Sequence, residues 1–342
     1  MTQGGRSAVD CGLAASAGLQ DCVIFWVAVR KVREQFTRMK KLFLATMLAV
    51  AAWAGEFTEE RVVIVPASGE PGGAGEAVTG AWLQPKEDWD GRAVLMLHGF
   101  ADVMDGPADV VKRLAERLAA AGIASLRINF RGEGDKKRTQ IESTFALRLA
   151  DTAAAQAWLL GRPGVKVERV GALGFSLGAT TAIVTAGHNP GWFRSIAVWS
   201  SPSGDMLEYY LKTSETARTA LREGVATEEG PGWKKITTRR EFYQSFRGAD
   251  VDQALAKYPG AFLSVRGSAD FLPQHEAVFM KILATNRPAS VPPGRDSGEA
   301  STRTAEAVLV SGADHIFNVF QPELGYADRA VQVTVEWFGR TL

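Results

Sequence analysis

Apolar and polar residues follow two patterns that alternate along the chain from residue 61 to its end. Short continuous apolar runs, such as residues 93–97, are typical of strands buried on both faces of a sheet. Longer segments with apolar residues three and four positions apart, such as residues 107–121, are typical of helices. The predicted strands are 61–65, 77–83, 93–97, 123–130, 169–174, 196–199, 261–265 and 307–310, and the predicted helices are 107–121, 145–160, 177–187, 276–283 and 327–338. This alternation predicts an α/β fold with a mainly parallel central sheet and helices on both faces.

One long segment interrupts the alternation. Residues 205–258 mix polar and aromatic side chains and contain no buried-strand run. A structureless loop of that length is rare in a compact domain unless it serves a function. We therefore predict a mostly helical cap at 205–258, inserted between the two parts of an α/β core, 55–204 and 259–342.

The N-terminal 54 residues have a composition of their own. The basic segment Met39-Lys40-Lys41 precedes an apolar run at 42–51 and the small-residue site Ala52-Trp53-Ala54. This is the order of a secretory signal peptide, and the apolar run is shorter than the roughly 20 residues that span a bilayer. We predict a signal peptide at 39–54 with an upstream extension at 1–38, and hence a periplasmic or secreted protein. The alternatives are an uncleaved anchor and a fortuitous apolar helix.

Charge and cysteine content exclude several classes of protein. The 342 residues include 39 Lys and Arg and 38 Asp and Glu, a formal net charge of +1. This balance argues against nucleic-acid partners and against stable association with an anionic membrane. The two cysteines, Cys11 and Cys22, precede the predicted cleavage site, so the processed chain would have no disulfide and no thiolate. With only four histidines besides, we expect no metal and no cofactor.

A nucleophile motif occupies the junction between a predicted strand and a predicted helix. Gly174-Phe175-Ser176-Leu177-Gly178 matches G-x-S-x-G, in which the two glycines permit a sharp turn that exposes the serine. The helix that follows directs its N-terminus at charge developing during acyl transfer. This context predicts Ser176 as a nucleophile, with a purely structural turn serine as the alternative.

A serine nucleophile needs a base, and His315 has the most suitable place among the histidines. His315 follows the last predicted strand, where its side chain can reach the serine over the sheet edge. His98 precedes the serine motif, His188 lies a helix length away from Ser176, and His275 is in or beside a later helix. His315 is therefore the predicted base.

The third member of such a triad is an acid that orients the imidazole. Asp270 follows the predicted strand 261–265 and lies between nucleophile and base in the chain. Asp314, Asp250 and Asp252 are the alternatives, and Asp314 is adjacent to the base, so that its side chain would have to fold back.

An oxyanion hole needs two backbone N–H donors. The residue after the nucleophile, Leu177, is expected to supply one, and Phe100, after the third predicted strand, the other. His98 is then expected to brace the loop that carries Phe100.

The motifs together resemble the α/β-hydrolase superfamily, from about Val78 onward. The similarity is to bacterial cinnamoyl/feruloyl esterase-like carboxylesterases and to the neighbouring S33-like hydrolases, and it rests on Leu97-His98-Gly99-Phe100, Asn129-Phe130-Arg131-Gly132-Glu133-Gly134-Asp135, the serine motif, Asp270 and His315. The resemblance implies the same triad and oxyanion hole, and a cap inserted after the sixth strand. Lys136 departs from these proteins, which often have Ser there.

The predicted function is hydrolysis of a small-molecule carboxylic ester, with a feruloyl, cinnamoyl or short-chain acyl group. Cap aromatics at Tyr209, Tyr210, Phe242 and Phe246 are candidate pocket walls, although they could equally form the cap's own core. A peptidase or acyltransferase with the same triad is the alternative. A non-catalytic binding protein is a further one, which the ordered triad argues against.

Overall fold

The computed structural model describes residues 57–66, 77–229, 234–285 and 304–342, and the structural statements below concern these residues. The predicted upstream extension and signal peptide lie outside them. Among the described helices, none has the length and apolarity needed to cross a membrane.

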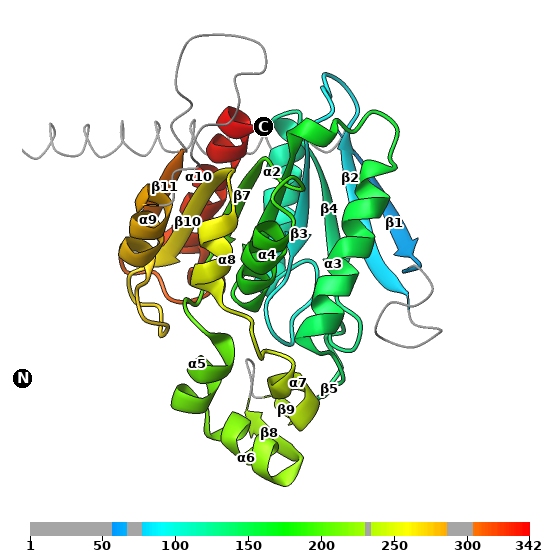
Figure 1. Ribbon diagram of the computed structural model, residues 1–342. Helices are drawn as coiled ribbons and strands as arrows, with labels where there is room; N and C mark the ends of the chain where they lie inside the picture. Colours follow the sequence, from blue (N-terminus) through cyan, green and yellow to red (C-terminus); the bar gives the residue numbers. More distant parts are fainter. Residues whose placement is uncertain (1–56, 67–76, 230–233, 286–303) are drawn as a thin grey trace, which may run out of the picture. The chain divides into compact units, whose positions relative to one another are not determined.

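An eight-stranded sheet organises the described residues (Figure 1). The strand order is β1-β2-β4-β3-β6-β7-β10-β11, and β2 runs antiparallel to both of its neighbours while the remaining pairs are parallel. The strands are β1 (Phe57–Ile64), β2 (Val78–Pro85), β3 (Ala93–Leu97), β4 (Ala124–Asn129), β6 (Val170–Phe175), β7 (Ser195–Trp199), β10 (Ala261–Gly267) and β11 (Ala305–Val310). The prediction of a mainly parallel sheet in an α/β fold is therefore confirmed.

Helices cover both faces of the sheet. One face packs against α3 (Phe145–Leu160), α4 (Leu177–His188), α8 (Val251–Lys257) and α9 (Glu276–Thr285), and the other against α2 (Val110–Ala120) and α10 (Tyr326–Thr341). All residues of β3 are buried, and they alternate between the two cores, with Leu95 on one side and Met96 on the other. Burial on both faces explains why the central strands have continuous apolar runs rather than an alternating pattern.

The predicted cap differs from expectation in its secondary structure. It contains α5 (Met206–Thr213), α6 (Glu215–Glu223) and α7 (Arg240–Gln244), but also an antiparallel pair of strands, β8 (Val225–Glu229) and β9 (Lys235–Arg239). A short strand from another part of the chain, β5 (Gln140–Ile141), pairs with β9 to complete a three-stranded sheet. Most of its described residues are helical, as predicted, and the strands β8 and β9 were not predicted.

The last helix of the predicted cap packs directly on the α/β core. A Cβ atom at Gly187 of α4 would lie 2.3 Å from the carbonyl oxygen of Ala254 in α8, so only glycine permits this close approach of the two helices. Helix α8 therefore belongs to the helix layer that covers the sheet, and the part of the insertion outside that layer is shorter than the predicted 205–258.

Candidate active site

Ser176 lies at a sharp turn between β6 and α4. Its backbone has φ 53° and ψ −117°, a strained conformation for a residue with a side chain. The Ser176 N–H donates a hydrogen bond to the Trp199 carbonyl oxygen at 2.8 Å, which helps to hold the turn. A Cβ atom at Gly174 would lie 2.3 Å from the Gly178 carbonyl oxygen, and one at Gly178 would lie 2.1 Å from the Leu97 carbonyl oxygen. Both motif glycines are therefore required by close backbone contacts.

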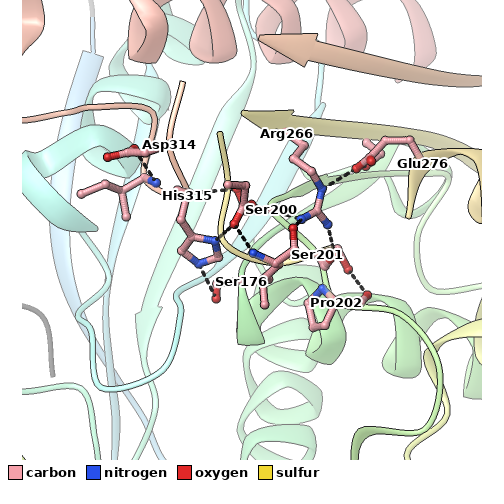
Figure 2. A network of polar contacts seen from close by, with 12 residues as sticks. Ser176, Ser200, Ser201, Pro202, Arg266, Glu276, Asp314 and His315 are labelled. Carbon is pink, nitrogen blue, oxygen red and sulfur yellow. Dashed lines mark hydrogen bonds and ion pairs between the residues drawn. The ribbon is translucent and has the colours of Figure 1, made fainter. Parts of the chain in front are cut away.

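The structure brings the three predicted triad residues together at the carboxyl ends of the parallel strands. His315 Nε2 lies 3.0 Å from Ser176 Oγ, as Figure 2 shows, and His315 Nδ1 lies 2.8 Å from Asp270 Oδ1. The Asp270 side chain is fully buried, and that of His315 is 14% exposed. One hydrogen-bonded line therefore runs from a buried carboxylate to a serine hydroxyl.

The surroundings of Asp270 favour its ionised form. Burial alone would raise the pKa of the carboxyl group, but the hydrogen bond and charge of His315, the Leu272 N–H and the Arg266 guanidinium together hold the pKa below its ordinary value. A carboxylate in this state accepts a hydrogen bond from His315 Nδ1–H, which leaves Nε2 free to accept a proton from Ser176.

The alternative aspartates have other partners. Asp314 Oδ1 accepts hydrogen bonds from the N–H groups of Ile316 and Asn318, so it closes the turn that carries His315 (Figure 2). Asp250 accepts from Gln253 N–H at the start of α8, and Asp252 accepts from the Ser203 hydroxyl. None of the three has a hydrogen bond to the imidazole among the described contacts, and Asp270 does.

The other histidines also lie away from the proton path. His188 ends α4, far along the helix from Ser176, and His275 immediately precedes α9. His98 is buried beside the Phe100 loop, where burial and the charge of Arg148 lower its pKa to about 4. A neutral His98 accepts from the Phe130 N–H at Nε2 and contacts the Gly99 carbonyl oxygen through Nδ1, and thereby braces the loop.

The residues of the two predicted oxyanion donors lie beside Ser176. Phe100 follows the end of β3, and Leu177 is the first residue of α4; both residues line the cavity that contains Ser176. In the described part of the chain, neither N–H donates to a protein acceptor. Both predicted oxyanion donors are thus available to a ligand.

A buried ion pair fixes the loop that carries Phe100. Glu133 pairs with Arg148, and both side chains are fully buried. The second carboxylate oxygen of Glu133 accepts from the Ala101 N–H at 3.0 Å, while Arg148 donates to the His98 carbonyl oxygen at 2.5 Å. Ala101 has φ 53°, so this pair holds the residue next to Phe100 in an unfavourable conformation.

We predict a large loss of stability when this pair is broken. In Glu133→Ala, the buried Arg148 charge loses its partner, which is expected to lower the free energy of unfolding by about 3–5 kcal/mol. Urea denaturation followed by circular dichroism measures the change. The matched control is Glu142→Ala, which removes a 57% exposed partner of Arg138 and is expected to cost less than about 1 kcal/mol. Equal losses in the two variants would contradict the role of the buried pair.

Aromatic side chains surround the cavity beside Ser176. They are Phe100, Tyr209, Tyr210, Phe242, Tyr243 and Phe271. Of the predicted wall residues, Tyr209, Tyr210 and Phe242 are therefore in place. Phe246 does not line this cavity: it is fully buried, stacks on Phe145 with ring centroids 4.9 Å apart and packs against Tyr210. The prediction that Phe246 is a wall residue was wrong, because its side chain is part of the core of the cap.

Sequence reasoning missed several residues of the site, among them Phe271, Glu228 and Arg266. The Phe271 ring lies 4.4 Å from the His315 ring and is 76% exposed, so it forms part of the rim. Glu228 brings a carboxylate to the cavity wall from β8. Arg266 contacts Asp270 from the end of β10. Of these, only Arg266 could have been noticed in the sequence, because it is a charged residue that directly follows the apolar run at 261–265.

Comparison with known proteins assigns the family. The model of the prolyl oligopeptidase family matches residues 110–291, a segment that includes Ser176 and Asp270 and ends before His315. The chain belongs to the prolyl oligopeptidase family. This family lies within the α/β-hydrolase superfamily that the sequence motifs resemble.

Solved structures similar to this prolyl oligopeptidase family member include esterases and a peptidase. Est1E from Butyrivibrio proteoclasticus with ferulic acid bound is 16% identical, with a TM-score of 0.59, and the match covers 82% of this chain and 98% of Est1E. An esterase domain from a Rhodothermus marinus protein is 17% identical, with a TM-score of 0.56 and coverage of 83% and 98%. Pyrococcus horikoshii acylaminoacyl peptidase is 15% identical, with a TM-score of 0.57 and coverage of 84% and 42%.

The comparisons confirm the predicted α/β-hydrolase fold and place the protein among hydrolases. None of the curated proteins matches the chain. Within the described residues, no group of three or more His, Cys, Asp or Glu side chains could hold a metal ion in this family member.

Proposed function

We propose that the protein is a serine carboxylic-ester hydrolase. The observation that carries the proposal is the continuous hydrogen-bonded line from Asp270 through His315 to Ser176. In an ester hydrolase, the serine oxygen attacks the ester carbonyl and the imidazole takes the serine proton and returns it to the leaving alcohol. Water then attacks the acyl-enzyme with the same base, and the acid product leaves.

The negative charge of the tetrahedral intermediate would be stabilised by backbone N–H groups and by a helix N-terminus. We infer that the backbone N–H groups of Phe100 and Leu177, residues that both line the cavity, donate to the oxyanion, and that the N-terminus of α4 adds its dipole. His98 and the Glu133–Arg148 pair keep the Phe100 loop in place.

The size and lining of the cavity beside the serine support a small aromatic acyl group as the substrate. The cavity volume of about 160 Å³ lies well below the roughly 300–1,000 Å³ of sites for drug-sized ligands. Its aromatic lining favours contact with an apolar, planar group. The resemblance to feruloyl esterases and the ferulic acid bound to Est1E support the same substrate class.

The experiment is a direct comparison of two esters. The full-length protein is assayed with methyl ferulate and with p-nitrophenyl butyrate, with Ser176→Ala as the blank. Comparable turnover of the two esters supports an aromatic-acyl esterase, while turnover of butyrate alone reduces the proposal to a short-chain carboxylesterase. Absence of ester turnover would overturn the proposal.

A peptidase is the second candidate function, favoured by the family match and by the similarity to acylaminoacyl peptidase. It predicts cleavage of amino-acid amides faster than that of esters. Acyl transfer predicts more product when an alcohol is added. The signal-peptide pattern at 39–54 supports action outside the cytoplasm for any of these activities.

We predict that Tyr209 selects for aromatic acyl groups. Tyr209 projects from α5 into the cavity wall, with its ring centroid 5.6 Å from that of Tyr210. In Tyr209→Ala, kcat/KM for methyl ferulate is expected to fall by about 10- to 100-fold while that for p-nitrophenyl butyrate changes less than about threefold. The control is Leu211→Ala on the same helix, an exposed residue that does not line this cavity. A parallel loss for both esters would show that Tyr209 does not discriminate between acyl groups.

A further inference from the structure

Arg266 is a fully buried cation near the end of β10, and each of its side-chain nitrogens has an acceptor. Nε donates to Glu276 Oε1 at 2.7 Å, and Nη1 donates to Asp270 Oδ2 at 3.1 Å. Nη2 donates to the Ser201 carbonyl oxygen, and Figure 2 shows this contact and the one to Glu276. The rigid fork of a guanidinium suits three acceptors in fixed directions, which a lysine ammonium on a flexible stem would not hold in the same way.

The contact with Asp270 orients the acid of the triad. The Asp270 carboxylate has two oxygens: Oδ1 meets His315 Nδ1 and accepts from the Leu272 N–H, and Oδ2 meets Arg266. Because Arg266 is a donor only, it keeps Oδ2 on its own side and leaves Oδ1 for the imidazole.

The contact with Ser201 orients the loop behind the base. Arg266 holds the Ser201 carbonyl group, and the adjacent Ser200 donates from its hydroxyl to the His315 carbonyl oxygen at 2.8 Å (Figure 2). The next residue, Pro202, lines the substrate cavity. One side chain therefore connects the acid, the backbone of the base and a wall of the cavity.

The charge of Arg266 also acts on the proton affinity of the triad. Asp270 interacts with His315 and Arg266, and Tyr209 is the further titratable group near it. Arg266 in turn faces Glu276 from α9 and His275 at the start of that helix. Burying an arginine in a strand carries a desolvation cost that an apolar residue would avoid, so the fold does not by itself explain its presence.

We propose that Arg266 is a positioning residue of the triad, which fixes the Asp270 carboxylate and the 200–202 loop and offsets part of the carboxylate charge at His315. The proposal rests on the proposed serine hydrolase function. Its consequence is kinetic and electrostatic: without the cation, the Asp270–His315 couple takes up a proton at higher pH, whichever of its two members holds that proton.

The test uses the rate of labelling of Ser176 by a fluorophosphonate probe, which reports activation of the serine whatever the natural substrate is. Labelling is measured from pH 5 to 9 in the full-length protein and in Arg266→Met, Arg266→Lys and Glu276→Gln. The matched control is Arg127→Met, which removes another fully buried arginine, paired with Glu59 and Asp105 at a distance from the triad. Circular dichroism of each variant confirms that it is folded. The Glu276 side chain is 14% exposed, so Glu276→Gln is expected to destabilise the fold less than the Arg266 variants do.

We expect opposite shifts from the two removals of charge. Arg266→Met lowers the maximal labelling rate by about 10- to 100-fold. It also moves the acid limb of the pH–rate profile, where labelling falls as the pH is lowered, to higher pH by about 0.5 unit or more. Glu276→Gln removes a negative charge and moves the acid limb downward. Arg266→Lys keeps the wild-type acid limb but loses rate, and Arg127→Met loses stability without a shift. A residue with a merely structural role would give no pair of shifts with opposite signs.

Two negative results have different meanings. If wild-type Ser176 is labelled and the acid limbs of Arg266→Met and Glu276→Gln coincide with that of the wild type, the role of Arg266 is overturned and the serine hydrolase function stands. If wild-type Ser176 is not labelled at all, both proposals are overturned.

Discussion

Ser176→Ala is expected to lower kcat for p-nitrophenyl butyrate by about 10⁴- to 10⁶-fold, because no acyl-enzyme can form without the hydroxyl group. The remaining activity would come from the oxyanion donors and from binding of the ester. The cavity loses one oxygen atom only, so KM is expected to change little. Initial rates at saturating ester, together with loss of fluorophosphonate labelling in the intact-mass spectrum, measure the effect.

The structure supplies controls for this variant. Alanine takes the same backbone conformation as serine at φ 53°, and the Ser176 N–H keeps its bond to Trp199, so thermal unfolding should occur within a few degrees of the wild type. Ser203→Ala removes a different hydroxyl group, one bonded to Asp252, and is expected to retain activity within about twofold. If Ser176→Ala kept more than a few per cent of wild-type turnover, another residue would have to be the nucleophile.

The serine turn could be predicted because its determinants are local. The backbone contacts that exclude side chains at Gly174 and Gly178 arise within one strand–turn–helix unit and the adjacent β3, so the motif itself carries the information. The central strands could be predicted for a related reason, since burial on both faces leaves a continuous apolar run.

The pair β8–β9 escaped prediction because its pattern is largely polar. In β9 the one large buried apolar side chain is Ile236, and β8 has no fully buried residue. Polar cross-strand contacts, such as Thr227 Oγ1 to Thr237 Oγ1 at 2.8 Å, take the place of an apolar face. Its third strand, β5, comes from a segment almost one hundred residues earlier, so no local window of sequence contains the sheet.

Residue type alone also could not separate cavity wall from core in the cap. Phe242 and Phe246 are four positions apart, and both are almost fully buried. Only Phe242 reaches the cavity, while Phe246 packs on Phe145 of α3. That difference depends on how the cap is placed over α3, a tertiary contact that the local sequence does not encode. For the acid, the chain position of Asp270 already favoured it over Asp314, and the structure adds the turn contacts of Asp314, which become visible only in three dimensions.

Asp270→Asn is expected to lower kcat/KM by about 10⁴-fold. An asparagine at this position has one carbonyl oxygen and one NH₂ group to distribute between His315 and Arg266. Arg266 donates to one of the two positions and the Leu272 N–H to the other; because the charged guanidinium is the stronger donor, the carbonyl oxygen turns toward Arg266 and the NH₂ group faces His315 Nδ1. His315 must then accept at Nδ1, which places its proton on Nε2, where it faces Ser176 Oγ and can no longer accept the serine proton.

Arg266 thus determines which way the amide of the Asp270→Asn variant faces, and a double variant tests this reasoning. In Arg266→Met with Asp270→Asn, the amide is free to turn its carbonyl oxygen to His315, so adding Arg266→Met to Asp270→Asn should restore part of the lost activity rather than lower it further. Steady-state kinetics of the two single variants and the double variant measure this coupling. The control is Asp250→Asn, where asparagine caps α8 as well as aspartate does and activity is expected to stay within about twofold. Additive losses in the double variant would contradict the argument that Arg266 sets the orientation of the residue at position 270, and a small loss in Asp270→Asn alone would remove Asp270 from the triad.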